Sequence, residues 1–281
     1  EPILQMTGRD RNRMALMGDA LAAAAFGIDT MLALTGDHPV VGDCKDAKPV
    51  SDLDSVGILN MLTKMEETGC DCGGNEIIGG APKFYKGASV TPLYEPMFLQ
   101  INKLRQKVEA GAMYIQTQGI FDLDYFKRFM EEVDKAGIKT HIMAGIIPLK
   151  AAGMAKFMNA NVPGIDVPQS MIDRLAAAAA EGKEKGIKGL PAKVGMEMAA
   201  EMIAKIKDEK LCDGVHIMAI GAEKKTLIVL ENNDSFAVKS AANIEGVQTA
   251  QYNTINTYDI VNADSLVIVK NAVAKIEEVY A

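Results

Sequence analysis

Short apolar runs alternate with longer segments of helical period along residues 1–222, and this alternation restricts the chain to few folds. It is typical of βα units, in which helices connect parallel strands that are buried on both faces. The expected strands are Pro2–Met6, Thr30–Leu34, Glu76–Ile78, Ala112–Thr117, Thr140–Ala144 and Gly214–Ile220. Repetition of the unit predicts an α/β fold, a TIM-type (β/α)8 barrel whose chemistry lies on the loops after the strands.

The connections between these strands support helices and short loops. Helices with an apolar stripe are expected at Arg11–Phe26, Phe98–Ala110 and Leu123–Ala136, and each is followed or ended by a glycine suited to a left-handed cap, at Gly27, Gly111 and Gly137. The alanine-rich run Leu175–Ala180 predicts a helix, and Lys183–Gly189 a solvated connection. An open, doubly wound sheet is the alternative. No G-x-G-x-x-G fingerprint or P-loop follows any expected strand, which disfavours its dinucleotide-binding form.

The composition changes near Glu223, because methionine is frequent before it and absent from Lys225 to Ala281. This tail predicts a small βαβαβα segment of its own. Its expected strands are Thr226–Leu230, Val247–Ala250 and Leu266–Val269, and its expected helices are Ser235–Ala242, Thr257–Val261 and Asn271–Val279. We therefore expect two parts, a barrel-like part at residues 1–222 and an appendage at residues 223–281.

Charge and cysteine content disfavour several classes of function. The net charge is −7 and the basic residues are scattered among carboxylates, so nucleic acid is not expected as a partner. No apolar run reaches the roughly 20 residues of a membrane span, which leaves the cytoplasm as the expected location. The four cysteines include the pair Cys70 and Cys72, whose spacing is not that of a zinc site. Free thiols and no bound metal are expected.

Two polar residues directly follow expected strands. Asp37 stands in Leu34-Thr35-Gly36-Asp37-His38-Pro39, where a glycine allows close approach of a ligand. Its alternative role is to cap the next helix in an ordinary turn. Gln118 offers one donor and one acceptor to the amide-like edge of a pterin or nicotinamide, and its alternative is a solvated loop residue.

Other polar groups have structural explanations that are at least as good. His38, His141 and His216 are too far apart in sequence for a local metal motif, and the last two are expected to line the core or the barrel. Ser51-Asp52-Leu53-Asp54 is expected to cap a helix. Arg9, Arg11 and Arg13, with Asp10, could bind a phosphate or balance charge, and the sequence does not separate the two.

An ordered set of motifs along some 220 residues resembles methylenetetrahydrofolate reductase, most closely the form from acetogen-type anaerobic bacteria. Each motif alone is weak evidence for this family, but the order and spacing of the whole set are specific to it. The motifs are Glu1-Pro2-Ile3-Leu4-Gln5-Met6-Thr7 with Arg9-Asp10-Arg11-Asn12-Arg13, Leu34-Thr35-Gly36-Asp37-His38-Pro39, Asp52-Leu53-Asp54-Ser55-Val56, Gly111-Ala112 with Thr117-Gln118 and Phe121-Asp122, and Gly145-Ile146-Ile147-Pro148.

This resemblance implies a flavoprotein oxidoreductase of one-carbon metabolism, which reduces 5,10-methylenetetrahydrofolate to 5-methyltetrahydrofolate by hydride transfer. The implied cofactor is FAD, with FMN as the alternative, and electrons would come from NADH or from a partner subunit in an oligomer or complex. Asp37 and Gln118 match the catalytic positions near flavin and folate. The positions that match the flavin site are Gln5, Thr7, Leu34, Thr35, Gly36, Gly80, Ala81, Lys103 and Lys107, with Lys107 the best candidate for phosphate.

The chain departs from the family pattern at both ends. The family begins with two further strands, and the first carries a Phe-Glu-Phe-Phe-Pro-Pro type motif whose glutamate donates a proton; that motif is missing here. We therefore expect an N-terminally truncated barrel with weak or no reductase activity in isolation. The tail from Lys225 to Ala281 resembles the end of the fourth large-subunit ribosomal protein. A non-enzymatic composite, or a ribosomal-type interaction module, is the alternative function.

Overall fold

The computed structural model describes residues 2–220, 226–230, 247–254, 265–268 and 270–280. The chain divides into two compact units, Glu1–Met218 and Ala219–Ala281. The expected boundary between residues 222 and 223 falls outside the described residues and stays a prediction. None of the described helices is both long and apolar enough to cross a membrane.

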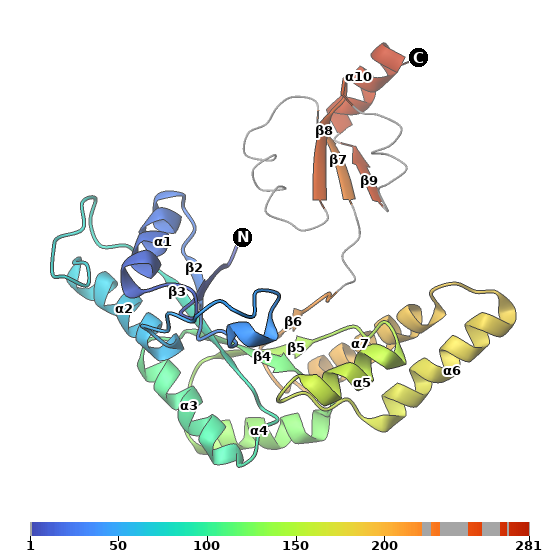
Figure 1. Cartoon of the computed structure of the whole chain (residues 1–281), viewed down its shortest axis with the longest axis horizontal. Helices are drawn as coiled ribbons and strands as arrows, with labels where there is room; N and C mark the ends of the chain where they lie inside the picture. Colours follow the sequence, from blue (N-terminus) through green and yellow to red (C-terminus); the bar gives the residue numbers. More distant parts are fainter. Residues whose placement is uncertain (1, 221–225, 231–246, 255–264, 269, 281) are drawn as a thin grey trace. The chain divides into compact units, whose positions relative to one another are not determined.

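A six-stranded parallel sheet forms the centre of the first unit (Figure 1). Its strands are β1 (Leu4–Thr7), β2 (Thr30–Leu34), β3 (Tyr85–Val90), β4 (Tyr114–Gly119), β5 (His141–Ile146) and β6 (Gly214–Ile217). They lie side by side in sequence order, β1-β2-β3-β4-β5-β6. A doubly wound sheet reverses its strand order at a switch point, so this order excludes that alternative. The α/β prediction is confirmed. Closure into a barrel is not, because no pairing joins β1 to β6 within the described residues.

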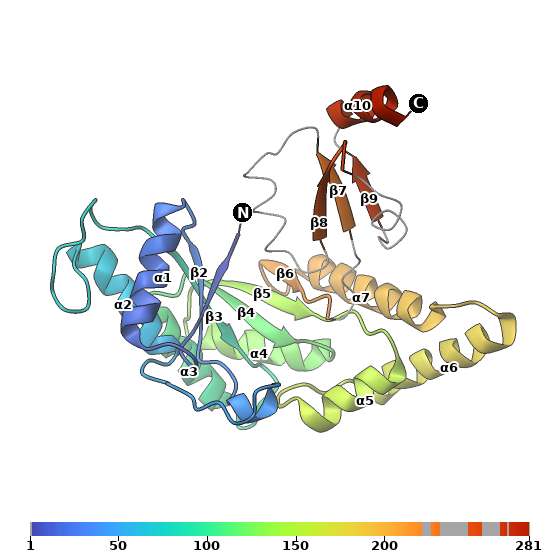
Figure 2. The same ribbon diagram turned by 45° about the horizontal axis from the view of Figure 1, so that its top comes forward.

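Helices cover one face of this sheet. The helices α1 (Arg13–Ala25), α2 (Ser55–Thr68), α3 (Met97–Glu109), α4 (Leu123–Lys135) and α7 (Leu190–Asp208) share one hydrophobic core with the strands. Figure 2 shows α1 to α4 following one another along the sheet. A second core joins α5 (Ala152–Asn161) and α6 (Gln169–Lys185) to α7 and to the loops after β4 and β5. We call the opposite face of the sheet, toward which Tyr114 points, the inner face.

One glycine and one tyrosine determine how the inner face is packed. In the register of the sheet, Leu32 of β2, Gly87 of β3 and Tyr114 of β4 are neighbours. The Tyr114 ring lies against Gly87 and stacks on Tyr85 with 5.2 Å between ring centroids. Its hydroxyl donates to the Met31 carbonyl oxygen at 3.0 Å, two strands away. A side chain at position 87 would occupy the place of this ring.

This packing explains the one strand that the sequence missed. The predicted strand Glu76–Ile78 is wrong: Ile78 is 101% exposed, and Glu76 forms only an isolated antiparallel bridge to Cys70. The true strand, β3, has the sequence Tyr-Lys-Gly-Ala-Ser-Val and lacks an apolar run. Position 87 of this strand has to be glycine, because the Tyr114 ring lies against it. Tertiary packing, rather than a local apolar pattern, therefore determines this strand.

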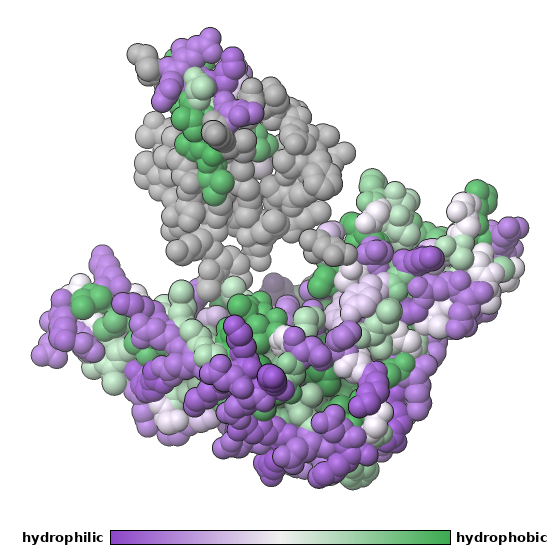
Figure 3. Space-filling view, turned by 180° about the vertical axis from the view of Figure 1, so that it is seen from behind, coloured by the Kyte–Doolittle hydropathy of each residue, from purple (hydrophilic) through white to green (hydrophobic). Residues whose placement is uncertain are grey.

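Most other predicted elements are confirmed within a few residues. Gly27, Gly111 and Gly137 have φ values of 74°, 106° and 67°, as expected for left-handed helix ends. The alanine-rich run lies inside α6. The predicted connection Lys183–Gly189 is wrong in its first part, because α6 continues to Lys185 and ends at Gly186 with φ 66°. Hydrophilic side chains lie over much of the outer surface, with smaller apolar patches between them (Figure 3).

Carboxylates pair with all three arginines after β1. Arg9 binds Asp10, Arg11 binds Asp19 at 2.8 Å, and Arg13 binds Asp52. The last pair is bidentate, since the Arg13 Nε and Nη2 atoms donate to Asp52 at 2.9 and 2.8 Å and the Arg13 backbone N–H adds a third bond at 2.8 Å. Of the two alternatives, charge balance is therefore the one that the geometry favours.

The second unit contains a three-stranded parallel sheet in the order β8-β7-β9. Its strands are β7 (Thr226–Leu230), β8 (Val247–Gln251) and β9 (Ser265–Ile268), followed by α10 (Lys270–Tyr280). The three predicted strands and the last predicted helix are confirmed. The predicted helices at Ser235–Ala242 and Thr257–Val261 lie outside the described residues.

Replacement of Gly87 by alanine tests the packing of the inner face. The new methyl group must displace the Tyr114 ring, so Gly87→Ala should lower the free energy of unfolding by about 1–3 kcal/mol. Urea denaturation measures the change. Gly18→Ala, in α1 where a Cβ meets nothing within 4 Å, is the matched control and should raise stability by about 0.5–1 kcal/mol. Equal effects of the two substitutions would contradict this packing.

The Arg13 pair predicts a specific acid sensitivity. The side-chain and backbone hydrogen bonds from Arg13 lower the pKa of Asp52 from 3.8 to about 2. The unfolded chain then binds the extra proton first, so this contribution to stability is complete above the unfolded pKa and is lost as pH falls toward 2. Asp52→Asn should therefore lose less stability than the native chain between pH 5 and pH 2.5, measured by the urea midpoint. Asp46→Asn, in the same loop, should behave like the native chain; parallel curves for Asp52→Asn would contradict the assignment.

Candidate functional site

The loops after β1 and β2 are locked together at the carboxyl edge of the sheet. The backbone N–H of Gly8 donates to the Leu34 carbonyl and that of Arg9 to the Thr35 carbonyl, both at 3.0 Å. Further along, the Val50 N–H donates to the Arg9 carbonyl at 2.7 Å. Any Cβ at Gly8 would collide with the Leu53 carbonyl, so only glycine allows this approach. The two loops therefore present a fixed surface at the strand ends.

Gly36 places Asp37 at this edge. Its φ of 86° is one that other residues rarely adopt, and a Cβ there would collide with the Thr7 side chain. Asp37 is exposed, and within the described residues no hydrogen bond or ion pair of its carboxylate is found. Its backbone carbonyl accepts from the Arg9 guanidinium at 3.1 Å. The carboxylate is thus held near the strand ends with its oxygens available.

The capping role considered for Asp37 is wrong. The element that follows is a 3-10 helix, Pro39–Val41, and its cap is His38, whose Nδ1 accepts from the Val40 N–H at 3.2 Å. The capping role predicted for the next acidic segment is confirmed at Asp54, whose Oδ1 accepts from the Gly57 N–H at 2.8 Å at the start of α2. Asp37 therefore caps neither of these two helices.

Gln118 lies at the carboxyl end of β4, beside an irregularity in the ladder. The register with β5 shifts between Gln116 and Gly119. Thr117 stabilises this bulge, because its hydroxyl accepts from the Gly145 N–H and donates to the Gln118 carbonyl, each at 2.8 Å. The half-buried Gln118 side chain uses Oε1 to accept from the Gly119 N–H at 3.2 Å. Bulges of this kind redirect a side chain next to active sites.

Uncharged polar groups extend from this edge along β1 and β2. In the register, Gln5 lies beside Leu32 and Thr7 beside Leu34, the last residue of β2. Met6 is buried in the core shared with the helices, so alternation places Gln5 and Thr7 on the inner face. Thr35 is tied to α2, since its Oγ1 accepts from the Ser55 N–H at 3.2 Å. These residues can offer amide and hydroxyl groups to a neutral heterocycle.

One amine reaches the carboxyl end of β3 from α3. The Lys107 Nζ donates to the Ser89 carbonyl at 2.6 Å, and no carboxylate lies within ion-pair distance of it among the described residues. Burial, followed by the charge of Lys103, lowers the Lys107 pKa. Lys103 itself is exposed. An anion brought to this place would relieve the cost of holding a partly desolvated ammonium.

The structure corrects the positions of Gly80 and Ala81. They were expected to follow a strand, but they precede β3 and therefore belong to the opposite, amino edge of the sheet. Thr91 takes the place directly after β3, and its side chain contacts the Gly164 backbone in the loop before α6. The turn Thr91-Pro92-Leu93 is the sequence feature that would have indicated Thr91, if β3 had been recognised before it. The flavin role of Gly80 and Ala81 loses its geometric basis.

Glu95, Tyr125 and Arg128 form a cluster at the same edge that the sequence did not indicate. The Tyr125 hydroxyl donates to the Glu95 carboxylate at 2.9 Å, and the Arg128 guanidinium lies 4.8 Å from the Tyr125 ring centroid. Burial and the Glu95 contact raise the Tyr125 pKa to about 12. These residues join the loop after β3 to α4. Glu95 and Arg128 are thus both in contact with Tyr125.

Histidines and cysteines do not converge on a metal site in the described part of the chain. His141 lies 3.6 Å from Asp213 and is 67% exposed, contrary to the expected core position. His216 is half-buried on β6, where burial lowers its pKa. The four cysteines are free, as expected.

Comparisons with curated proteins find similarity to the large ribosomal subunit protein uL4. The protein from Alkaliphilus oremlandii (strain OhILAs) is 55% identical over 62 residues, which are 22% of this chain and 30% of that protein. The protein from Alkaliphilus metalliredigens (strain QYMF) is 51% identical over 73 residues, 26% of this chain and 35% of the other. The chain therefore spans about a third of the length of these relatives. The ribosomal resemblance is confirmed over a short segment.

Solved structures give a weaker match. An uncharacterised protein from Clostridium thermocellum, which binds two copies of 5-methyl-5,6,7,8-tetrahydrofolic acid, is 12% identical with a TM-score of 0.36. The match covers 78% of this chain and 87% of that one. A TM-score this low supports no conclusion about the present chain.

A protein-family model gives the decisive match. The model described as methylenetetrahydrofolate reductase matches residues 1–234, most of the chain and all of the six-stranded sheet. The resemblance seen in the motifs from Gln5 to Pro148 is thereby confirmed. The chain belongs to the methylenetetrahydrofolate reductase family.

Proposed function

We propose that the chain reduces 5,10-methylenetetrahydrofolate to 5-methyltetrahydrofolate with FAD, or alternatively FMN, as its cofactor. The observation that carries this proposal is the meeting of Thr7, Leu34–Asp37 and Gln118 at one carboxyl edge, in a chain of this family. Parallel α/β folds hold their substrates at that edge. The flavin, when bound, supplies the hydride.

The inner face fits the ring of a flavin by its chemistry. Gln5, Thr7 and Gln118 provide uncharged donors and acceptors, which suit the N–H and carbonyl edge of an isoalloxazine. Thr35 and Gly36 bring backbone groups to the same edge, beside Leu34. Lys107, with Lys103 one turn before it, is the cation that would hold the phosphate side.

Asp37 and Gln118 act on folate in this proposal. The Asp37 carboxylate, which forms no hydrogen bond or ion pair among the described residues, would offset positive charge that develops on the folate as its methylene group becomes an iminium. No hydrogen bond of the Gln118 amide nitrogen is found among the described residues, so it can donate to the pterin and orient it while Oε1 stays on the Gly119 N–H. Electrons would be delivered by NADH or by a partner subunit in a complex.

A lysine substitution tests cofactor binding. Lys107→Met keeps the aliphatic stem but removes the charge, so it should weaken FAD binding by about tenfold, the cost of one charge-assisted hydrogen bond. Titration followed by flavin absorbance at about 450 nm measures the affinity. Arg105→Met, on the same helix and exposed, is the matched control and should bind FAD normally.

Two outcomes would decide against the reductase proposal. A native chain that stays colourless after reconstitution would contradict it. Binding of RNA with a steep dependence on salt would favour a second candidate, a ribosomal-type interaction module, which the 55% identity to uL4 over 62 residues supports.

Substitutions at the carboxyl edge should separate chemistry from binding. With the flavin reduced in advance under anaerobic conditions, Asp37→Asn should slow its reoxidation by methylenetetrahydrofolate by about ten- to hundredfold, because an electrostatic contribution is lost. Gln118→Ala should mainly raise the folate concentration that gives half the maximal rate. Rapid-mixing absorbance measures both. Unchanged kinetics in Asp37→Asn, with normal flavin content, would remove the role proposed for Asp37.

A further inference from the structure

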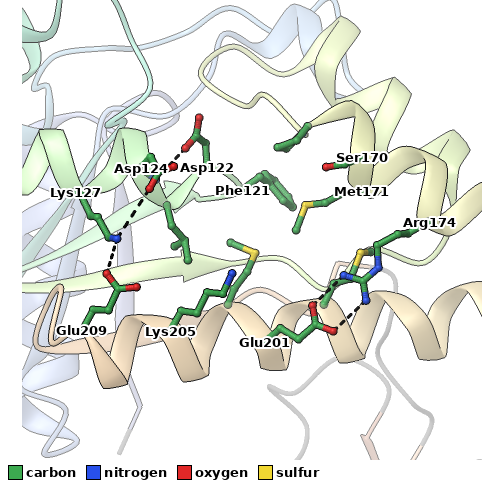
Figure 4. A pocket seen from close by; sticks show the side chains of 14 residues that line it. Phe121, Asp122, Asp124, Lys127, Ser170, Met171, Arg174, Glu201, Lys205 and Glu209 are labelled. Carbon is green, nitrogen blue, oxygen red and sulfur yellow. Dashed lines mark hydrogen bonds and ion pairs between the residues drawn. The ribbon is translucent and has the colours of Figure 1, made fainter.

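A cavity of about 370 Å³ lies between α4, α6 and α7, apart from the carboxyl-edge residues discussed above (Figure 4). Its size is in the range of small-molecule sites, which begins at about 300 Å³. Its lining comes from the loop after β4 and the start of α4, from the first turns of α6 and from α7.

Three methionines and one phenylalanine form most of the apolar part of this lining, which also includes Leu123 and Pro168. Phe121, Met198 and Met202 are buried, and Met171 of α6 is partly buried against the same cores. Methionine side chains adapt to the shape of a bound apolar group. The cavity therefore offers an apolar surface that can accommodate an aliphatic chain or a phenyl ring.

Most charged side chains around the cavity already have a partner within the protein. Lys127 pairs with Glu209, and Arg174 pairs with Glu201 through two hydrogen bonds of 2.9 and 3.0 Å. Asp122 caps α4 by accepting from two backbone N–H groups, both at 2.9 Å. Asp124 is 96% exposed, 3.9 Å from Lys127. Each of these groups is compensated or open to water.

Lys205 differs from these groups only in its pairing. It is exposed. The hydrogen bonds from Arg174, with help from the charge of Lys205, lower the pKa of Glu201, which lies one turn before Lys205 on α7. The Lys205 amine points into the space between α4 and α6 (Figure 4), and none of the ion pairs found among the described residues includes it. The Ser170 hydroxyl, a second hydrogen-bond donor, lines the same cavity from α6. A cation that forms no ion pair and lies beside an apolar surface is complementary to a molecule that is anionic at one end and apolar at the other.

We propose that this cavity binds a small amphipathic carboxylate. Its carboxylate contacts Lys205 and Ser170, and its apolar body lies on Phe121, Met171 and Met202. The site does not depend on the reductase proposal, because none of its residues belongs to the flavin and folate positions.

Calorimetry on the full chain tests the site with three probes that differ only in the head group: 4-phenylbutanoate, its neutral amide and the corresponding amine. The carboxylate should bind about tenfold more tightly than the amide and the amine should be weakest, because only the carboxylate gains the charged contact. Lys205→Met should abolish the preference for the carboxylate. Lys207→Met, on the same helix but outside the cavity, should leave it unchanged.

Two further variants locate the bound probe. Met171→Gln changes a partly buried cavity residue without changing charge, and it should weaken all three probes about equally. Gln118→Ala should leave the affinity for 4-phenylbutanoate as it is in the native chain. Equal affinities for the three probes, a preference that survives Lys205→Met, or loss of binding in Gln118→Ala would each overturn the proposal.

Discussion

The sequential pairing of six parallel strands, with their helices on one side, is the constraint on which the rest of the first unit depends. Because the strands run in order from β1 to β6, the loops after them all arrive at one edge. Because one hydrophobic core takes up the helix-facing side chains of every strand, the alternate residues are free to form the inner face. Gln5, which is exposed, and the half-buried Thr7 and Gln118 give this face its uncharged polar groups.

Two close backbone approaches turn this general plan into a specific site. Gly8 lies against the Leu53 carbonyl, and Gly36, with positive φ, lies against Thr7. These contacts fix the loop that carries Asp37 onto the loop after β1, while His38 takes over the capping of the next helical turn. The Asp37 carboxylate consequently forms no hydrogen bond or ion pair in the described part of the chain, although the charge of Arg9 acts on it, and it lies at the edge where a substrate would lie.

Much of the architecture follows from sequence patterns, since β2, α1, α3 and α4 have clear apolar periods and glycine ends. The pattern fails at β3, where Gly87 is dictated by the ring of Tyr114, a residue 27 positions away along the chain. That failure carried over to the site, because Gly80 and Ala81 were placed after a strand that does not exist and Thr91 was overlooked. The availability of Asp37 and Lys205 could not be predicted either, because it depends on where other side chains find their partners. The tail shows the reverse case: its three strands were predicted from sequence, although it resembles a different protein from the rest of the chain.

The most direct test of the central claim is the product of a single anaerobic turnover by the full chain, reconstituted with FAD and reduced in advance. The account predicts that adding 5,10-methylenetetrahydrofolate reoxidises the flavin and yields one 5-methyltetrahydrofolate for each flavin, as determined by chromatography. A chain that binds no flavin, or a reduced flavin that remains reduced with the folate unchanged, would contradict it.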